Sequence, residues 1–203
     1  GKHMRILKRF PRDFWLFVDK EDAQLTEDIA IVDIETTSKN PGLGEMICIG
    51  IGRAWRDEII IYFDEKKWTA VFSEILRHKN YAGWNVRFDK RWLEHYGFPA
   101  INCIVYIADL EQLILPEKCW IELQPEEFAP LHRYHYPFKV EDPFQYRLKR
   151  ARMVDYYRAY KKSSGVSRDV IRSVIVLHNY WDIVRETWWL IQYMIELKME
   201  EKK

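Results

Sequence analysis

The first half of the chain alternates short apolar runs with turn residues. Three runs rich in β-branched residues are typical of strands, and they lie at 29–34, 46–52 and 58–63. The loop at 38–42 separates the first run from the second, and 53–57 forms the turn before the third. Short connections between successive strands predict an antiparallel meander.

Helical periodicity begins after the third strand. Apolar residues at helical spacing predict an amphipathic helix over 66–78. A short strand at 81–84, a helix at 88–96 and another strand at 103–107 follow. This order predicts an α/β fold, in which a mixed sheet is flanked by helices.

The second half of the chain is less regular. Residues 116–146 carry five prolines among clustered aromatic residues, and we interpret them as an irregular insertion. Helical patterns return at 147, with a break at 163–165, and the last apolar pattern runs over 170–197 with an interruption near His178. No repeat or linker divides the chain, so a single domain is expected over 4–203, after an expression scar at 1–3.

Composition narrows the class of protein. The chain has 203 residues, 48% of them hydrophobic, and a net charge of +1, so any affinity for nucleic acid must come from local patches. Charges of both signs make up 31% of the residues, which fits a thermophile surface. The three cysteines form no CxxC pair, which argues against a zinc ribbon and predicts a cytoplasmic protein. No apolar stretch is long enough to span a membrane.

Two acids interrupt the first apolar run. Asp33 and Glu35 are two residues apart on a strand, so their side chains leave the same face. Carboxylates this close raise each other's pKa unless a cation holds them, and Mg²⁺ or Mn²⁺ prefers such oxygen ligands. Hydrated acids at the rim of a sheet would give the same pattern, and both interpretations stay open.

Two further motifs carry polar residues at a spacing that could serve one site. In the first, Asn85 and Asp89 lie at a strand-to-helix junction, where an N-cap and an acid in the first turn would explain them equally well. In the second, His178 and Asp182 are one helical turn apart and share a helix face. A simple surface pair would also explain the second motif.

Together, the three motifs resemble those of the DEDD (DnaQ-like) 3′–5′ exonucleases of the ribonuclease H-like superfamily. The DxE motif of that family is matched by Asp33 and Glu35, its NxxxFD-like motif by 85–89, and its final helical aspartate by Asp182. The sequences DIETT, GWNVRFD and HNYWDI are most similar to those of the YprB-like branch and of archaeal single-strand exonucleases.

The resemblance covers about 29–110 and 170–195 and implies a ribonuclease H-like fold. That fold is a mixed five-stranded sheet, an antiparallel meander plus parallel strands, flanked by helices. The implied function is hydrolysis of single-stranded nucleic acid, DNA rather than RNA, from the 3′ end, with release of nucleoside 5′-monophosphates. Two Mg²⁺ or Mn²⁺ ions would be held by four acids, which are Asp33, Glu35, Asp89 and Asp182.

The general base implied by the resemblance is His178. In the histidine subtype of the family the base precedes the last aspartate by five positions, and in the tyrosine subtype by four. His178 lies at the tyrosine spacing from Asp182, so it has the chemistry of one subtype and the position of the other. Tyr180, two residues before Asp182, is expected on another face of the helix.

Several residues are candidates for substrate binding. Thr36 and Thr37 follow the acidic strand and would hold the terminal nucleotide or simply cap the strand end, while Asn85 would bond a phosphate or sugar. The segment 147–172 carries nine Lys or Arg with interleaved tyrosines. Such a track holds single strands by base stacking and phosphate contacts, and its members include Arg150, Tyr157 and Lys161. A solvated helix face with inward tyrosines is the alternative.

Two other functions stay open. One is an RNA-processing exonuclease or a structure-specific nuclease of the same fold. The other is a nucleic-acid-binding module without turnover, although four mutually repelling acids would then have no purpose.

Overall fold

The computed structural model describes residues 2–5, 20–56, 58–64, 66–106 and 153–202. Six strands form one sheet in the order β1-β4-β3-β2-β5-β6. Their bounds are Lys2–Arg5 (β1), Ile29–Thr36 (β2), Met46–Arg53 (β3), Glu58–Phe63 (β4), Asn80–Gly83 (β5) and Cys103–Tyr106 (β6). The insertion expected at 116–146 lies outside the described residues, and the single-domain interpretation stays a prediction.

The sheet is mixed, as predicted. Strands β2, β3 and β4 form an antiparallel meander, while β5 pairs parallel with both β2 and β6. The predicted α/β class, with an antiparallel meander, parallel strands and flanking helices, is therefore confirmed. The sixth strand, β1, was not predicted, and it includes Lys2 and His3 of the segment interpreted as a scar. Its sequence KHMR has no apolar run, and its backbone pairs antiparallel with the edge of β4.

Five α-helices are described, at Lys20–Gln24 (α2), Phe72–Leu76 (α3), Val86–His95 (α4), Met153–Lys162 (α8) and Gly165–Glu201 (α9). The helix predicted over 66–78 is a 3₁₀ turn, Trp68–Val71, that continues into α3. The other 3₁₀ turns are Pro41–Leu43 and Ala54–Arg56. The break between α8 and α9 is as predicted. The interruption predicted near His178 is wrong, because α9 continues through it.

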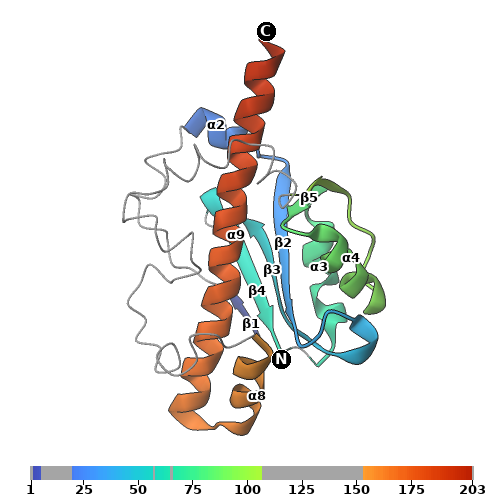
Figure 1. The fold of residues 1–203 in the computed structure, drawn as a ribbon, viewed down its shortest axis with the longest axis vertical. Coiled ribbons are helices and arrows are strands. Elements are labelled where there is room, and N and C mark those ends of the chain that lie inside the picture. Colours follow the sequence, from blue (N-terminus) through green and yellow to red (C-terminus); the bar gives the residue numbers. More distant parts are fainter. Residues whose placement is uncertain (1, 6–19, 57, 65, 107–152, 203) are drawn as a thin grey trace.

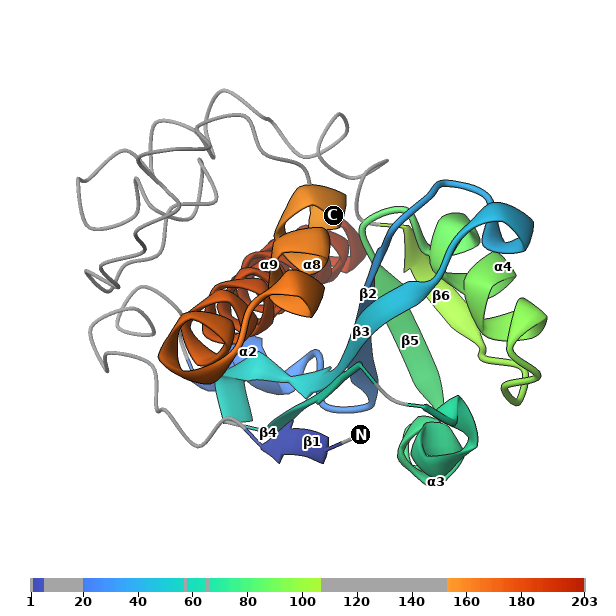
Figure 2. The same cartoon turned by 90° about the horizontal axis from the view of Figure 1, so that it is seen from below.

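Helices cover both faces of the sheet (Figures 1 and 2). The helices α8 and α9 lie against one face, whereas α3 and α4 lie against the other. Each face has its own core: Ile29 and Ile31 of β2 pack with α9, and Ala30 and Val32 pack with the core under α3 and α4. The alternation along β2 therefore decides which of its side chains face α9.

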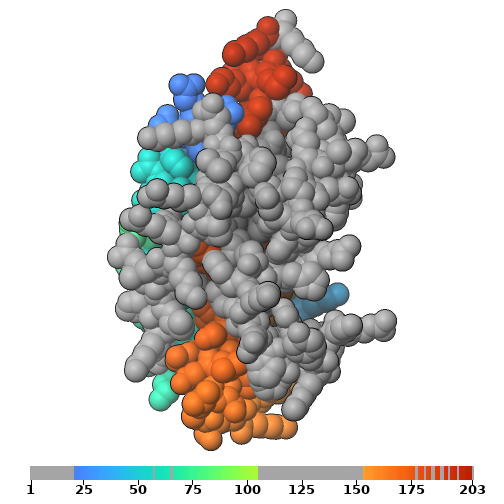
Figure 3. Space-filling model, turned by 90° about the vertical axis from the view of Figure 1, so that its left-hand side faces the viewer, coloured from blue at the N-terminus to red at the C-terminus, as the bar shows by residue number. Residues whose placement is uncertain are grey.

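The long helix α9 runs most of the length of the molecule (Figure 1). Figure 3 shows α8 and the start of α9 at one end, and the last turns of α9 beside α2 at the other. Within the described part of the chain, no helix is long and apolar enough to cross a membrane.

Candidate active site

The strand β2 directs two carboxylates at α9. Ile29 and Ile31 belong to the core on the α9 side, and Asp33 and Glu35 continue the same alternation toward the end of the strand. Ile34, between the acids, belongs to the opposite core. The two acids therefore lie where the buried part of the strand ends, at its carboxyl end, which is where open α/β sheets bind their ligands.

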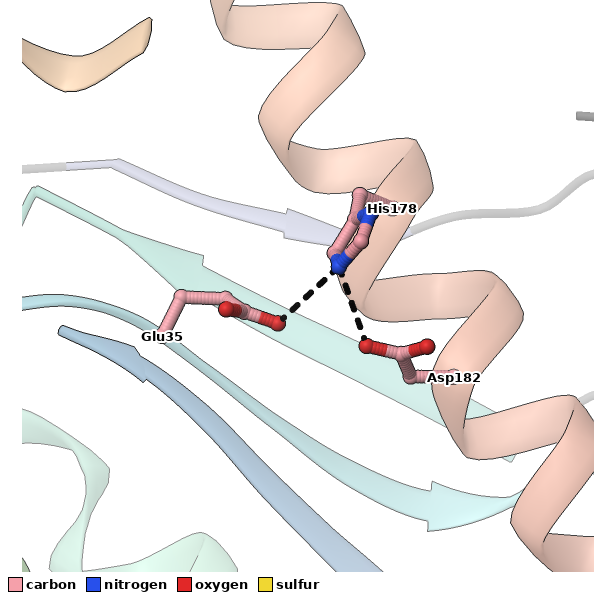
Figure 4. A group of neighbouring side chains, drawn as sticks. All are labelled: Glu35, His178 and Asp182. Atoms are coloured by element: carbon pink, nitrogen blue, oxygen red, sulfur yellow. Dashed lines mark ion pairs between the residues drawn. The ribbon is translucent and has the colours of Figure 1, made fainter. Parts of the chain in front are cut away.

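The helix α9 brings His178 and Asp182 to the same place (Figure 4). The Nε2 atom of His178 lies 3.2 Å from Oδ2 of Asp182 and 3.7 Å from Oε1 of Glu35. One potential metal-ligating atom of each of these three residues lies within 4.8 Å of the others. His178 and Asp182 are thus no simple surface pair, because Glu35 of the sheet also lies beside His178.

Asp89 reaches the site from the opposite side, on α4. The pairing of β2 with β5 ends at Ile31, so the N–H of Ile34 has no partner from β5. Oδ1 of Asp89 accepts a hydrogen bond from that N–H at 3.1 Å. The side chain is buried, with 3% exposure, and hydrated acids in a first helical turn are not buried in this way. This contact places Asp89 between the two acids of β2.

Glycine at the end of β5 permits this close approach. A Cβ atom on Gly83 would lie 2.9 Å from the carbonyl oxygen of Val32. Only a residue without a side chain lets the chain turn from β5 into α4 so near β2. Close packing against β2 thus explains the glycine in the sequence GWN of the second motif.

A cleft of about 340 Å³ joins these groups. Its lining contains all five predicted catalytic residues, which are Asp33, Glu35, Asp89, His178 and Asp182. Ile34, Trp84, Asn85 and Phe88 complete the walls. Asn85 is exposed at the N-cap of α4, but its side chain makes no capping hydrogen bond. The capping interpretation therefore does not explain Asn85, whose side chain lines the cleft.

Burial and like charges strain the carboxyl groups. Burial raises the pKa of Asp33 well above its usual range, and the charges of Glu186 and Asp182 raise it further. Burial raises the pKa of Glu35 to about 7, although His178 works in the opposite direction. Burial also raises the pKa of Asp89 to about 8, against the hydrogen bond from Ile34. Without a cation these acids hold protons near neutral pH.

Asn179 is a site residue that the sequence analysis missed. Its Nδ2 donates to the carbonyl oxygen and to Oδ2 of Asp33, both at 3.1 Å, and the residue is fully buried. A Cβ atom on Gly50 would lie 2.2 Å from Oδ1 of Asn179, so glycine on β3 makes room for this contact. The signal was present, because Asn179 is three residues before Asp182 and helical neighbours at that spacing share a face.

Glu186 is a second missed residue. It lies one helical turn beyond Asp182, is fully buried, and its charge raises the pKa of Asp33. The same spacing that linked His178 to Asp182 also links Asp182 to Glu186, so the pattern extends one turn beyond the motif.

The two threonines have local partners. The hydroxyl of Thr36 donates to the carbonyl of Ser38 at 2.7 Å, and Oγ1 of Thr37 accepts from the N–H of Glu45 at 2.8 Å. Neither lines the cleft. These bonds fit the strand-capping interpretation, and a role in substrate binding stays a prediction.

The basic and aromatic residues of α8 lie elsewhere. Tyr157 is 4% exposed, donates to Oδ1 of Asp64 at 2.5 Å, and packs edge-on against Phe63. Lys161 pairs with Glu45 at 2.9 Å. Both line a second cleft and not the acidic one. Tyr157 thus packs inward and offers no face for a base, whereas Arg150 lies outside the described residues.

The donor set fits divalent metal ions. Four carboxylates converge on one cleft, and oxygen donors suit hard cations such as Mg²⁺ and Mn²⁺. Burial is the main cause of the raised pKa values of Glu35 and Asp89, because it disfavours their charged forms. A cation would remove that cost, so the residues present fit the ions that the family resemblance implies.

Comparisons with known proteins add little to this geometry. The chain matches no protein-family model, and a search of curated proteins finds no significant match. Among solved structures it is similar to one described as the apo form of the nuclease. That similarity has a TM-score of 0.38 and 10% sequence identity, over 90% of this chain and 89% of the other.

Proposed function

We propose that this chain is a metal-dependent nuclease of the DEDD (DnaQ-like) type, which removes nucleotides from the 3′ end of single-stranded nucleic acid. The observation that carries the proposal is the convergence of five residues in one cleft. They come from β2, α4 and α9, and sequence motifs selected them independently of the structure. DNA is the proposed substrate, as in the single-strand exonucleases that the motifs resemble.

The carboxylates Asp33, Glu35, Asp89 and Asp182 are the proposed ligands of two Mg²⁺ or Mn²⁺ ions. Bound there, the ions would supply Lewis-acid activation of water and stabilisation of the leaving 3′-oxygen. Asp33 is held through its contacts with Asn179, and Asp89 through the N–H of Ile34. Each of these two carboxylates keeps one oxygen outside those hydrogen bonds.

His178 is the proposed general base. Its side chain is 27% exposed, in contrast to Asp182 at 11%, so it lies at the open side of the site. Glu35 and Asp182 flank its Nε2 at 3.7 Å and 3.2 Å and would hold the imidazole at the cleft, where it could take a proton from water.

Asn85 is the proposed contact to the terminal nucleotide. It is exposed and lines the same cleft as His178 from a different element. Phe88 and Trp84 add apolar walls to the same cleft, which suits the face of a base or sugar.

One assay tests the proposal. Single-stranded DNA, duplex DNA and RNA, labelled at either end, are incubated with Mg²⁺, Mn²⁺ or EDTA, beside the variant Asp33→Ala. We expect a ladder that shortens from the 3′ end, requires metal and is absent with the variant. A ladder formed from RNA alone would support the RNA-processing alternative. Binding without cleavage in every metal would support the non-catalytic module.

A further inference from the structure

A second and larger cleft lies at the other side of the β2 terminus. Its volume is about 690 Å³, and its walls come from the start of β3, the end of β4, α8 and the start of α9. Four cations line it, and they are Lys66, Lys161, Arg168 and Arg172. Two acids, Glu45 and Asp64, lie among them. The lining therefore carries an excess of positive charge, beside a site that is acidic.

The two acids are already engaged. Glu45 forms an ion pair with Lys161 at 2.9 Å, and Asp64 accepts a hydrogen bond from the hydroxyl of Tyr157 at 2.5 Å. Among the residues that the structure describes, neither Lys66 nor Arg168 forms an ion pair. These two exposed cations therefore have no ion-pair partner, and Asp64, whose donor Tyr157 is neutral, is the one lining acid that is not paired with a cation.

The side chain of Arg172 contains a buried N–H group without a hydrogen-bond acceptor among the described residues. Its NH2 group lies 3.6 Å from the exposed Asp169, whereas its buried Nε has no hydrogen-bond partner among the described residues. Arg168, one turn earlier, lies 4.4 Å above the ring of Tyr160 and donates to its hydroxyl at 3.2 Å. Aromatic packing thus holds the guanidinium of Arg168 in place beside an arginine whose Nε has no acceptor among the described residues.

The two clefts adjoin. Glu35 lines the acidic cleft, and the next residue, Thr36, pairs in the sheet with Met46, which lines the basic cleft. Cα atoms paired in an antiparallel ladder are about 5 Å apart. On α9, Arg172 precedes His178 by six residues, which is about 9 Å along the helix. A chain bound in the acidic cleft reaches the basic cleft within a short distance.

The chemistry of the lining selects phosphates over bases. The rings of Tyr157 and Tyr160 are 4% and 7% exposed, and cations cover both of them. Neither of these two rings therefore offers an open face to a base, while Lys66, Lys161 and Arg168 are exposed. An anionic polymer held in this way would be recognised by its backbone and without sequence preference.

From this geometry we infer that the basic cleft binds backbone phosphates of the single strand whose 3′ end occupies the acidic cleft. The inference rests on the proposed function for the direction of the strand. Binding itself needs no turnover, so it is measured separately from cleavage.

The test compares two double variants that each remove two positive charges. Arg168→Gln with Arg172→Gln changes the basic cleft, and Lys79→Gln with Arg91→Gln removes exposed cations that line neither cleft. Affinity for a fluorescent deoxythymidine dodecamer is measured in EDTA over a range of salt. We expect the first variant to weaken binding about tenfold and to make the salt slope shallower by about 1.4, which is 0.7 for each of two phosphates. The control should behave as the wild type.

Cleavage supplies the second measurement. With metal, the first variant should lower the ratio of kcat/KM for the dodecamer to kcat/KM for a dinucleotide, again about tenfold. Equal binding by both double variants, or no binding by the wild type, would overturn the inference. Binding that responds as expected, with no cleavage of either substrate by the wild type, would support this cleft and contradict the nuclease.

Discussion

The two clefts beside the end of β2 differ in whether their acidic side chains have partners within the fold. In the basic cleft, Glu45 pairs with Lys161 and Asp64 accepts a hydrogen bond from Tyr157, so both acids have partners within the fold. In the acidic cleft, Asp33 and Asp89 accept hydrogen bonds but pair with no cation in the described part of the chain, and burial together with like charges raises the pKa of Asp33. Folding alone gains nothing from such an arrangement.

The comparison separates structural charges from charges that await a ligand. Burying a charged group costs free energy. A charge with a structural role is paired within the fold, whereas a charge in a binding site is left to be paired by the ligand. In a satisfied polar network, opposite charges pair with each other. The acidic cleft differs because its four carboxylates carry charge of the same sign. Each prediction below changes one side of this comparison.

The largest effect is expected from a change in the acidic cleft itself. Asp182→Asn removes a proposed ligand but keeps its size, and we expect nuclease activity to fall at least about 1,000-fold. Steady-state cleavage of labelled single-stranded DNA measures it. Glu200→Gln, an exposed acid on the same helix, should cleave normally. A variant Asp182→Asn with ordinary activity would remove this acid from the mechanism.

His178→Ala should lower the rate of cleavage by roughly 100-fold or more, because a positioned general base contributes about that factor. Single-turnover kinetics separate this chemical step from product release. His95, which is exposed at the end of α4, offers a control in His95→Ala. If His178→Ala keeps its full rate, the histidine only balances the charges of Glu35 and Asp182.

Asn179→Leu tests the positioning of Asp33. Loss of a hydrogen bond to a metal ligand typically costs 10- to 100-fold in metal affinity or activity, so we expect a loss of about that size. The informative measurement is the Mn²⁺ concentration that gives half of the maximal rate. It should rise in the variant if Asn179 acts through Asp33, and an unchanged value would assign Asn179 to packing only.

A smaller effect concerns stability and pH in EDTA. The folded protein holds protons on Glu35 up to about pH 7 and on Asp89 up to about pH 8, far above the unfolded values near 4. Stability that depends on these bound protons is complete below about pH 4 and is lost as the pH rises to about 8. Thermal unfolding should therefore show a falling Tm over that range, and Asp89→Asn should flatten it. A Tm that rises over the same range would contradict the raised pKa values.

Much of the fold follows from local sequence patterns. The runs that predict β2, β3 and β4 are apolar and β-branched, and the structure places their strands within a residue or two of the prediction. The edge strand β1 was not predictable, because its charged sequence carries no pattern and its pairing depends on β4. The continuity of α9 was also missed, since His178 and Asp182 interrupt an apolar stripe without ending the helix.

The candidate site was predictable only where order along the chain carried information. Asp33, Glu35, Asp89, His178 and Asp182 were found together, and all five line one cleft. The spacing of Asn179 and Glu186 from Asp182 placed them on its helix face, but only the structure shows the hydrogen bond of Asn179 and the charge effect of Glu186 at Asp33, about 150 residues away in the sequence. Tyr157 and Tyr160 of α8 show the converse, since their spacing suggested a binding face and their packing buries them.

The most direct measurement for the central claim is thermal unfolding with and without Mn²⁺ at pH 8. A ligand at 100 times its dissociation constant stabilises the folded state by about 2.7 kcal/mol, so Tm should rise by roughly 5–10 °C. Asp33→Asn should lose most of this rise, because the variant lacks a proposed ligand. A wild-type Tm that does not respond to Mn²⁺, or an equal rise in the variant, would contradict a metal site in the acidic cleft.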